Sequence, residues 1–162
     1  MRRGRDLAGE GVQIVVMRGA TNINRHIAEL APTGVRLGGL YDAQEQHFFR
    51  RALERHGLRP EGSPEPLEVQ GFFVCVQDLE DEFIRALGVD GMLAVLEEAG
   101  DLRLFQLLQQ QPAQRGRPVE AQLRRFLGIK SGRKARYGRL LADAVPLARV
   151  PPPLDGVLGW CR

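Results

Sequence analysis

The chain has 162 residues, of which 43% are hydrophobic and 27% charged, and its formal net charge is +3. This length suits one domain of ordinary size, and the composition excludes collagen-like, coiled-coil and extensively disordered chains. Two cysteines do not make a disulfide framework, and no apolar run approaches the roughly 20 residues of a membrane-spanning helix. We therefore expect a cytoplasmic protein that does not span a membrane.

The charge is distributed unevenly along the chain. Residues 1–100 carry 11 basic and 16 acidic side chains, whereas residues 115–139 carry nine basic side chains and one acid, Glu120. Asymmetry of this kind points to a polyanion partner, although a charged run is more often a solvated helix face. Both interpretations of the basic segment stay open on charge alone.

Three apolar runs alternate with amphipathic segments in the first hundred residues. The runs that predict strands are 12–17, 35–41 and 71–76. A helix is predicted after each run, because apolar side chains recur at helical spacing, as Ile23, Ile27 and Leu30 do in the first of them. Alternation of this kind with fully apolar strands predicts right-handed crossovers and a parallel sheet flanked by helices.

Local signals set the ends of these elements. Pro32 and Gly34 stop the first helix, and Gly57 supplies the residue just beyond the end of the second. Two glycines, 38 and 39, allow close backbone approach in the second strand. Residues 59–68, with three acids and three prolines, are predicted to form an exposed loop.

The remainder of the chain is predicted to be helical. The expected helices cover 90–98, 101–111, 118–127 and 132–144, followed by a short amphipathic tail after three consecutive prolines. We therefore divide the chain into an α/β core over 1–100 and a helical, basic C-terminal extension over 101–162 that packs on the same domain.

Acidic residues follow two of the predicted strands. Asp42 and Glu45 come after the second strand, and Asp78 and Glu80 after the third. Ligands of open parallel sheets bind beyond the carboxyl ends of the strands, so the four carboxylates converge if the two strands are neighbours. Hard oxygen ligands in that arrangement suit Mg²⁺ or Mn²⁺, which activate water and clamp the oxygens of a phosphodiester.

Helix capping is the competing interpretation of the same acids. An Asp before a helix with an acid three residues later forms a capping box, and both Asp42 with Glu45 and Asp78 with Asp81 fit that spacing. Caps are more common than metal sites, and the two roles are compatible at Asp42.

A basic helix supplies the third candidate element. Lys130, Arg133 and Arg136 are expected along one side of the helix 132–144, whose N-terminal amides and cations suit a phosphate. The alternative is an ordinary solvent-exposed basic helix. Residues 19–22 lie between a strand and a helix but lack a full phosphate-loop pattern, so we expect no ATP site in this chain.

Several motifs taken together resemble the Toprim domain of OLD-family nucleases. They are Val-Val-Met-Arg-Gly-Ala-Thr-Asn-Ile (15–23), Gly-Leu-Tyr-Asp-Ala (39–43), Gly-Phe-Phe-Val-Cys-Val-Gln-Asp-Leu-Glu-Asp-Glu (71–82), Gln-Gln-Gln-Pro-Ala-Gln-Arg-Gly-Arg-Pro (109–118) and Ser-Gly-Arg-Lys (131–134). The resemblance spans nearly the whole chain. It implies a Toprim-like sheet, DNA as substrate, two divalent metals, and an ABC-type ATPase domain or chain as partner.

The resemblance also implies roles for particular residues. Asp42 corresponds to the first acid of the family's D-x-D motif, with Gln44 at the second position and Glu45 as a substitute for it. Asp78 and Glu80 correspond to the acids after the next strand. Lys134 corresponds to the catalytic basic residue that stabilises charge developing on the phosphate. The resemblance further places Arg133, Arg136 and Arg139 against the DNA backbone, where contacts position the protein rather than read bases.

The main departure from the family lies at the front of the chain. The family begins with a strand that ends in a catalytic glutamate within a Val-Glu-Gly pattern, and we expect this strand to be missing here. The strand predicted at 12–17 must then pair differently, or another chain must fill the gap, which leaves homo-oligomerisation open. Metal affinity and activity depend on whether the strand pairs differently or another chain fills the gap.

Three hypotheses follow. The first is a Toprim-type, Mg²⁺- or Mn²⁺-dependent DNA nuclease domain, present as an incomplete copy of an OLD-family endonuclease. The second is a catalytically inactive remnant that binds DNA or a protein through 115–139. The third is a receiver-like or other small α/β binding domain in which the acids serve as helix caps.

Overall fold

The computed structural model describes residues 6–128 and 132–161, with the side chains of 133–135 outside that description. The chain forms two compact units, which we describe separately. The first, here called the sheet unit, comprises residues 6–78 and 152–161. The second, here called the helical unit, comprises residues 79–151. The predicted division at residue 100 stays a prediction.

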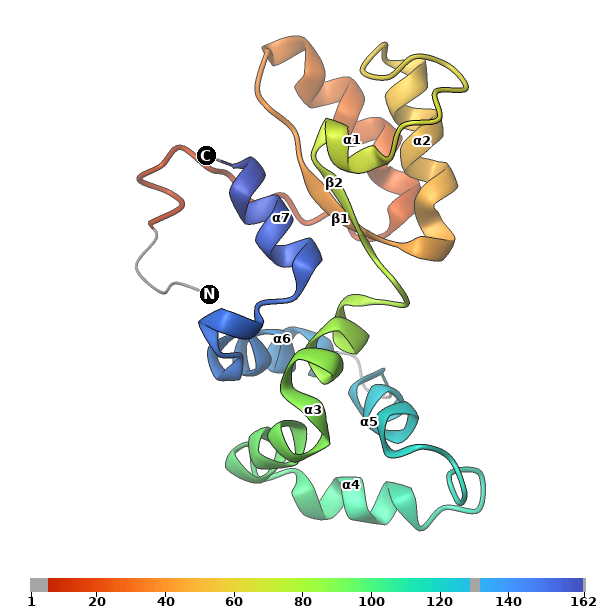
Figure 1. Cartoon of the computed structure of the whole chain (residues 1–162), viewed down its shortest axis with the longest axis vertical. Helices are drawn as coiled ribbons and strands as arrows, with labels where there is room; N and C mark the ends of the chain where they lie inside the picture. Colours follow the sequence, from red (N-terminus) through yellow and green to blue (C-terminus); the bar gives the residue numbers. More distant parts are fainter. Residues whose placement is uncertain (1–5, 129–131, 162) are drawn as a thin grey trace. The chain divides into compact units, whose positions relative to one another are not determined.

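The sheet unit contains a parallel pair of strands, β1 (Gly39–Asp42) and β2 (Phe72–Cys75), with Gly39 opposite Phe72 and Asp42 opposite Cys75. Its helices are α1 (Ile23–Leu30), α2 (Gln46–Arg55) and α7 (Pro152–Trp160). Short 3-10 turns, η1 (Ala20–Asn22), η2 (Ala31–Thr33), η3 (Ala43–Glu45) and η4 (Leu67–Gln70), flank these helices and strands. A parallel sheet flanked by helices is therefore confirmed in coarse outline (Figure 1).

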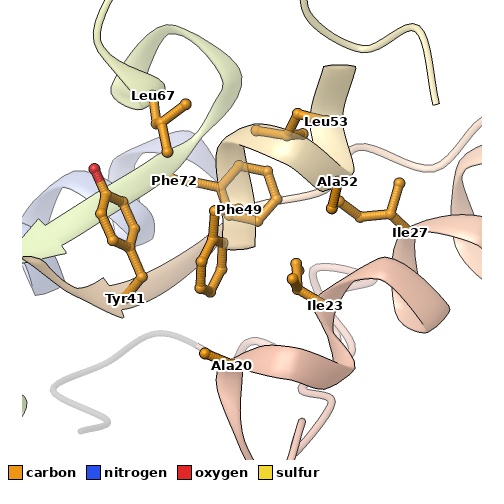
Figure 2. Close-up of a cluster of buried hydrophobic side chains, with 9 residues drawn as sticks. All are labelled: Ala20, Ile23, Ile27, Tyr41, Phe49, Ala52, Leu53, Leu67 and Phe72. Carbon is orange, nitrogen blue, oxygen red and sulfur yellow. The ribbon is translucent and has the colours of Figure 1, made fainter. Parts of the chain in front are cut away.

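One face of the strand pair packs on α1 and α2. Tyr41 and Phe72 point toward Phe49 of α2, with ring centroids 5.0 and 5.7 Å from the Phe49 ring (Figure 2). Ile23 and Ile27 of α1 complete this cluster, as their helical spacing predicted. The local stop signals are also confirmed, since α1 and the turn that follows it end at Gly34, which has a φ of 75°.

The opposite face of the strand pair packs on α7. Side chains alternate along a strand, so Phe73 lies on the face away from Phe72. A Cβ added at Gly156 of α7 would lie 2.5 Å from the Phe73 ring, which shows how closely the helix approaches. Trp160 lies against Gly38 and Gly71 at the start of the strands. The predicted close backbone approach in the second strand is therefore confirmed at Gly38.

The strand predicted over 12–17 is wrong. These residues form no strand, and Ile14 and Val16 are 76% and 75% exposed. The β-branched run has the composition of a strand, but strand preference reflects packing against neighbouring strands. Within the described residues the sheet has two strands only, so 12–17 has no such neighbours. The second strand is also shorter than predicted, because it begins at Gly39 rather than at residue 35.

The helical unit contains α3 (Leu79–Glu98), α4 (Leu102–Gln109), α5 (Val119–Gly128) and α6 (Arg133–Ala144). Gly88 interrupts α3 with a φ of 70° and a ψ of 173°, values that lie outside the helical region. Phe105, Phe126 and Tyr137 stack edge to face at 5.6 and 6.4 Å in the core between α4, α5 and α6. The helices predicted in this part of the chain are confirmed, with ends shifted by a residue or two.

None of the helices in the described residues combines the length and the apolar character that crossing a bilayer requires.

Candidate functional site

The acids predicted at the strand ends follow two neighbouring parallel strands. Asp42 is the last residue of β1 and lies opposite Cys75, the last residue of β2. Asp78 comes three residues after Cys75, in the same sheet unit. The sequence predicted that these acids converge if the two strands are neighbours. The structure shows that the two strands are neighbours.

The capping interpretation fails at the first pair of acids. Asp42 occupies the N-cap position of η3, yet its side chain makes no capping hydrogen bond there. Glu45 occupies the N-cap position of α2 and likewise makes no capping hydrogen bond through its side chain. Both side chains are half-buried. Helix capping therefore does not account for this acidic pair.

The acids after β2 divide between the two units. Asp78 ends the sheet unit, and Glu80 lies in the first turn of α3 in the helical unit. Asp81 and Glu82, also in that first turn, both pair with Arg85, with 3.2 Å between Arg85 Nε and the Asp81 carboxylate. Glu82 is only 5% exposed, so this ion pair satisfies a buried carboxylate.

A metal site needs several donors at one point. The described residues contain no group of three or more His, Cys, Asp or Glu side chains placed to hold one ion. Mg²⁺, however, usually keeps several waters and is held by only one or two carboxylates together with substrate phosphates. Asp42 and Asp78 at adjacent strand ends have the donor chemistry for that mode of binding.

The predicted basic site lies only partly in the described residues. Lys130 is outside them, and Arg133 and Lys134 lie in the first turn of α6 with side chains outside the description. Arg139, farther along α6, has an 88% exposed side chain whose Nε is 3.9 Å from the carboxylate of Asp143. Of the two predicted DNA-contacting arginines whose side chains the structure describes, Arg136 and Arg139, the more exposed Arg139 suits that role better.

Arg136 has an intramolecular role that the sequence reading missed. Its Nη1 donates to Oδ2 of Asp101 at 3.0 Å, and its Nη2 donates to the carbonyl of Ala99 at 2.7 Å. The hydroxyl of Tyr137 donates to the same Asp101 oxygen at 2.8 Å. These bonds join the start of α6 to the segment between α3 and α4. The sequence signal was an acid directly after Gly100, but its partners lie more than 30 residues away.

A second network that sequence reasoning missed involves glutamines of the 109–118 motif. Gln109 donates from Nε2 to Oε1 of Gln122 at 2.8 Å, and Gln122 donates from Nε2 to the backbone carbonyl of Gln114 at 2.8 Å. Gln114 and Gln122 are 5% and 6% exposed. The glutamines of this motif therefore fix the loop between α4 and α5 on the helical core.

Residues 59–68 were predicted to form an exposed loop, but Arg59 in this segment is buried. It is 2% exposed and donates from Nη1 to Oε1 of Gln70 at 2.8 Å. Its Nη2 donates to the carbonyls of Ser63 and Glu65, at 2.7 Å for Ser63. The prediction of exposure is therefore wrong for Arg59, because its guanidinium is the centre around which the loop folds.

Burial raises the pKa of the Tyr41 phenol, and the negative charge of Glu68 raises it further. The side-chain hydrogen bond with Gln46 and the charges of Arg50 and Arg59 act in the opposite direction. Tyr41 is therefore a neutral core residue that keeps its proton at physiological pH.

No family model matches this chain, and no curated protein or solved structure matches it either.

Proposed function

We propose that this chain is a Toprim-type domain for Mg²⁺- or Mn²⁺-dependent cleavage of DNA phosphodiesters. The observation that carries the proposal is the parallel pairing of β1 and β2, in which Asp42 ends β1 opposite Cys75 and Asp78 follows three residues later. The failure of the capping interpretation at Asp42 adds to it, because that carboxylate makes no capping hydrogen bond. The sequence motifs that resemble the OLD-family Toprim domain supply the reaction class.

In this proposal each charged side chain has a distinct task. Asp42 and Asp78 hold the divalent ion, with Glu45 as a further carboxylate of the sheet unit; the role of Glu80 rests on the resemblance alone. A divalent ion bound there supplies Lewis-acid stabilisation of phosphate charge and a lowered pKa for water. Lys134 is assigned to charge that develops on the phosphate, and Arg139 to the DNA backbone.

The test is nicking of supercoiled plasmid in Mn²⁺ by the full chain. Asp42→Asn keeps the size of the side chain and removes its charge, so we expect nicking to fall at least tenfold. Glu29→Gln is the matched control, because its carboxylate is 60% exposed on α1 and belongs to no proposed site. Unchanged nicking in Asp42→Asn, or equal loss in both variants, refutes the metal site.

The second candidate function is DNA binding without cleavage through 115–139. The observation in its favour is the exposure of arginines in this segment, among them Arg115, Arg117, Arg125 and Arg139. Duplex binding that weakens with salt, in a chain that does not nick, supports this candidate. Arg139→Ala should then weaken binding to all sequences alike and reduce the salt slope by about one.

Arg136→Ala is the informative companion variant in the binding experiment. Its guanidinium already bonds to Asp101 and Ala99, so its loss is expected to affect stability as well as DNA affinity. A variant set in which only Arg136→Ala reduces binding would show that the helical unit must be intact, and would argue against direct contact by Arg139.

A further inference from the structure

An apolar segment of the sheet unit is exposed to solvent. Ile14, Val15 and Val16 are consecutive β-branched residues with exposed fractions of 76%, 42% and 75%. Scattered single exposed apolar residues are normal in proteins, but contiguous apolar surface marks an interaction site. Ile14 and Val16 are thus exposed apolar side chains two residues apart, in a segment that forms neither helix nor strand within one chain.

Hydrogen bonds lie on both sides of this segment, a local turn before it and a link to the core after it. The amide of Val12 donates to the carbonyl of Leu7 at 2.8 Å. The carbonyl of Met17 accepts from Nδ2 of Asn22 at 2.9 Å, and the Met17 side chain packs against the core cluster of the sheet unit. The exposed side chains therefore lie next to an anchor at Met17, which holds the C-terminal end of the segment on the sheet unit.

The chemistry of the segment favours pairing with another extended strand. Residues 12–17 contain four β-branched residues, no proline and no charge. Such runs have high strand preference and add readily to an exposed backbone edge. A helix-binding groove, in contrast, requires a concave apolar surface, which a single extended segment does not provide.

The flanking charges identify the partner strand. Glu10 is the charged residue nearest to the segment on its N-terminal side, and Arg18 follows the segment directly. Antiparallel pairing of two identical segments centred on Ile14 brings Glu10 of each copy opposite Arg18 of the other, whereas parallel pairing brings like charges together. Two-fold symmetric dimers produce antiparallel pairing of identical strands naturally. The segment is thus complementary to itself.

We propose that residues 12–16 pair antiparallel with the same residues of a second copy of this chain, and form the centre of a homodimer. Ile14 lies on the two-fold axis and faces its own counterpart, while Val12 faces Val16 of the partner copy. These apolar side chains share one face of the new strand pair, because alternate residues of a strand point to the same side. The proposal is independent of nuclease activity.

The first test is the mass of the full chain in solution, measured by light scattering across protein concentrations. We expect twice the monomer mass of 18.1 kDa, with dissociation on dilution. Ile14→Lys should yield a monomer with an unchanged circular dichroism spectrum, since the side chain it replaces is 76% exposed. Leu147→Lys is the matched control at an apolar side chain that is 62% exposed elsewhere, and it should remain dimeric.

A second test examines the register of the pairing. Residues directly opposite each other in antiparallel strands have Cβ atoms about 4.5–5.5 Å apart, which is close to the separation that a disulfide bridges. In a Cys161→Ser background, Ile14→Cys should cross-link to its counterpart under mild oxidation. Gln13→Cys should do so much less, because residue 13 faces residue 15 of the other copy. Cys75 is buried and serves as an internal non-reacting thiol.

Several results overturn the proposal. A wild-type chain whose mass stays at 18.1 kDa at all concentrations excludes the homodimer. The exclusion holds even if residues 12–17 are protected from hydrogen exchange, because that protection would then come from pairing within one molecule. A dimer that survives Ile14→Lys places the interface elsewhere. A dimer that cross-links equally well through Gln13→Cys and Ile14→Cys refutes the antiparallel register.

Discussion

The packing of α7 on the strand pair leads to a quantitative prediction at Gly71. This glycine has a φ of 84°, and a Cβ placed on it would lie within 2.8 Å of three atoms of the Trp160 indole. The left-handed backbone conformation costs a non-glycine residue about 1 kcal/mol. Overpacking against a ring adds about 1–3 kcal/mol. We therefore expect Gly71→Ala to lower the free energy of unfolding by about 2–4 kcal/mol.

Two further variants separate the contributions to this loss. Gly57 has a φ of 70° with open space around its Cβ position, so Gly57→Ala should cost about 1 kcal/mol, the backbone contribution alone. In a Trp160→Ala background the clash is gone, and Gly71→Ala should then also cost about 1 kcal/mol.

The assay is chemical denaturation followed by circular dichroism, because the Trp160→Ala variants lack the only tryptophan of the chain. In the other variants, tryptophan fluorescence reports on the docking of α7 directly. Equal costs for Gly71→Ala and Gly57→Ala in the wild-type background would refute the close approach of Trp160 to β2.

Three more perturbations test separate parts of the structure. Burial raises the pKa of Tyr41 in the folded state, so the unfolded state loses the phenolic proton first. The contribution of Tyr41 to stability should therefore be constant below pH of about 10 and fall above it, and Tyr41→Phe should flatten the fall at alkaline pH in pH-dependent denaturation. Gln122→Leu removes the donor to the buried Gln114 carbonyl and should cost about 1–3 kcal/mol, with faster hydrogen exchange in the loop between α4 and α5; exchange at the wild-type rate would contradict this role. Asp101→Ala removes the acceptor shared by an arginine and a tyrosine of α6 and should cost about 1–3 kcal/mol in thermal unfolding. Asp143→Ala, at a 63% exposed carboxylate, should change stability by less than about 0.5 kcal/mol. Equal losses of stability in Asp101→Ala and Asp143→Ala would contradict the role of Asp101 as the shared acceptor.

Elements with strong local signals were predictable from the sequence. The first helix was located by apolar spacing at Ile23 and Ile27 and by Pro32 and Gly34 after it. The alternation of strands and helices predicted a parallel sheet, but it left open whether these two strands are neighbours, as the pairing of β1 and β2 shows them to be. The signals for the first helix lie within a few residues of it, so no knowledge of distant neighbours was needed to locate it.

The strand expected at 12–17 shows why other predictions failed. The composition of the run specifies a preference for pairing but not the presence of a partner strand, and in the structure Ile14 and Val16 are exposed. The cover of the second sheet face by α7 was equally beyond reach, since Trp160 and Gly38 are separated by more than 100 residues. In both cases the structure depends on contacts with residues that are distant in the sequence, and a local sequence pattern does not identify those residues.

The candidate site likewise has one part that was predictable from the sequence and another that was not. Its position beyond the carboxyl ends of β1 and β2 was predictable, because Asp42 directly follows one apolar run and Asp78 comes two residues after the next. The role of Arg136 was not, because its position in a basic run does not reveal the Asp101 carboxylate that accepts its hydrogen bond. A charge run therefore mixes side chains that stabilise the fold with side chains, such as that of Arg139, that are exposed to solvent.

The small size of the sheet links the two proposals. A pair of strands alone is marginal in water, so β1 and β2 depend on cover from both sides. Tyr41 and Phe72 bury one face against α2, and Phe73 buries the other against Gly156 of α7. Asp42 follows Tyr41 directly, so its carboxylate is held in place by packing on both faces rather than by further strands. The exposed run 12–16 makes no strand contact with this pair, which means that variants at Ile14 test association while leaving the support of Asp42 intact.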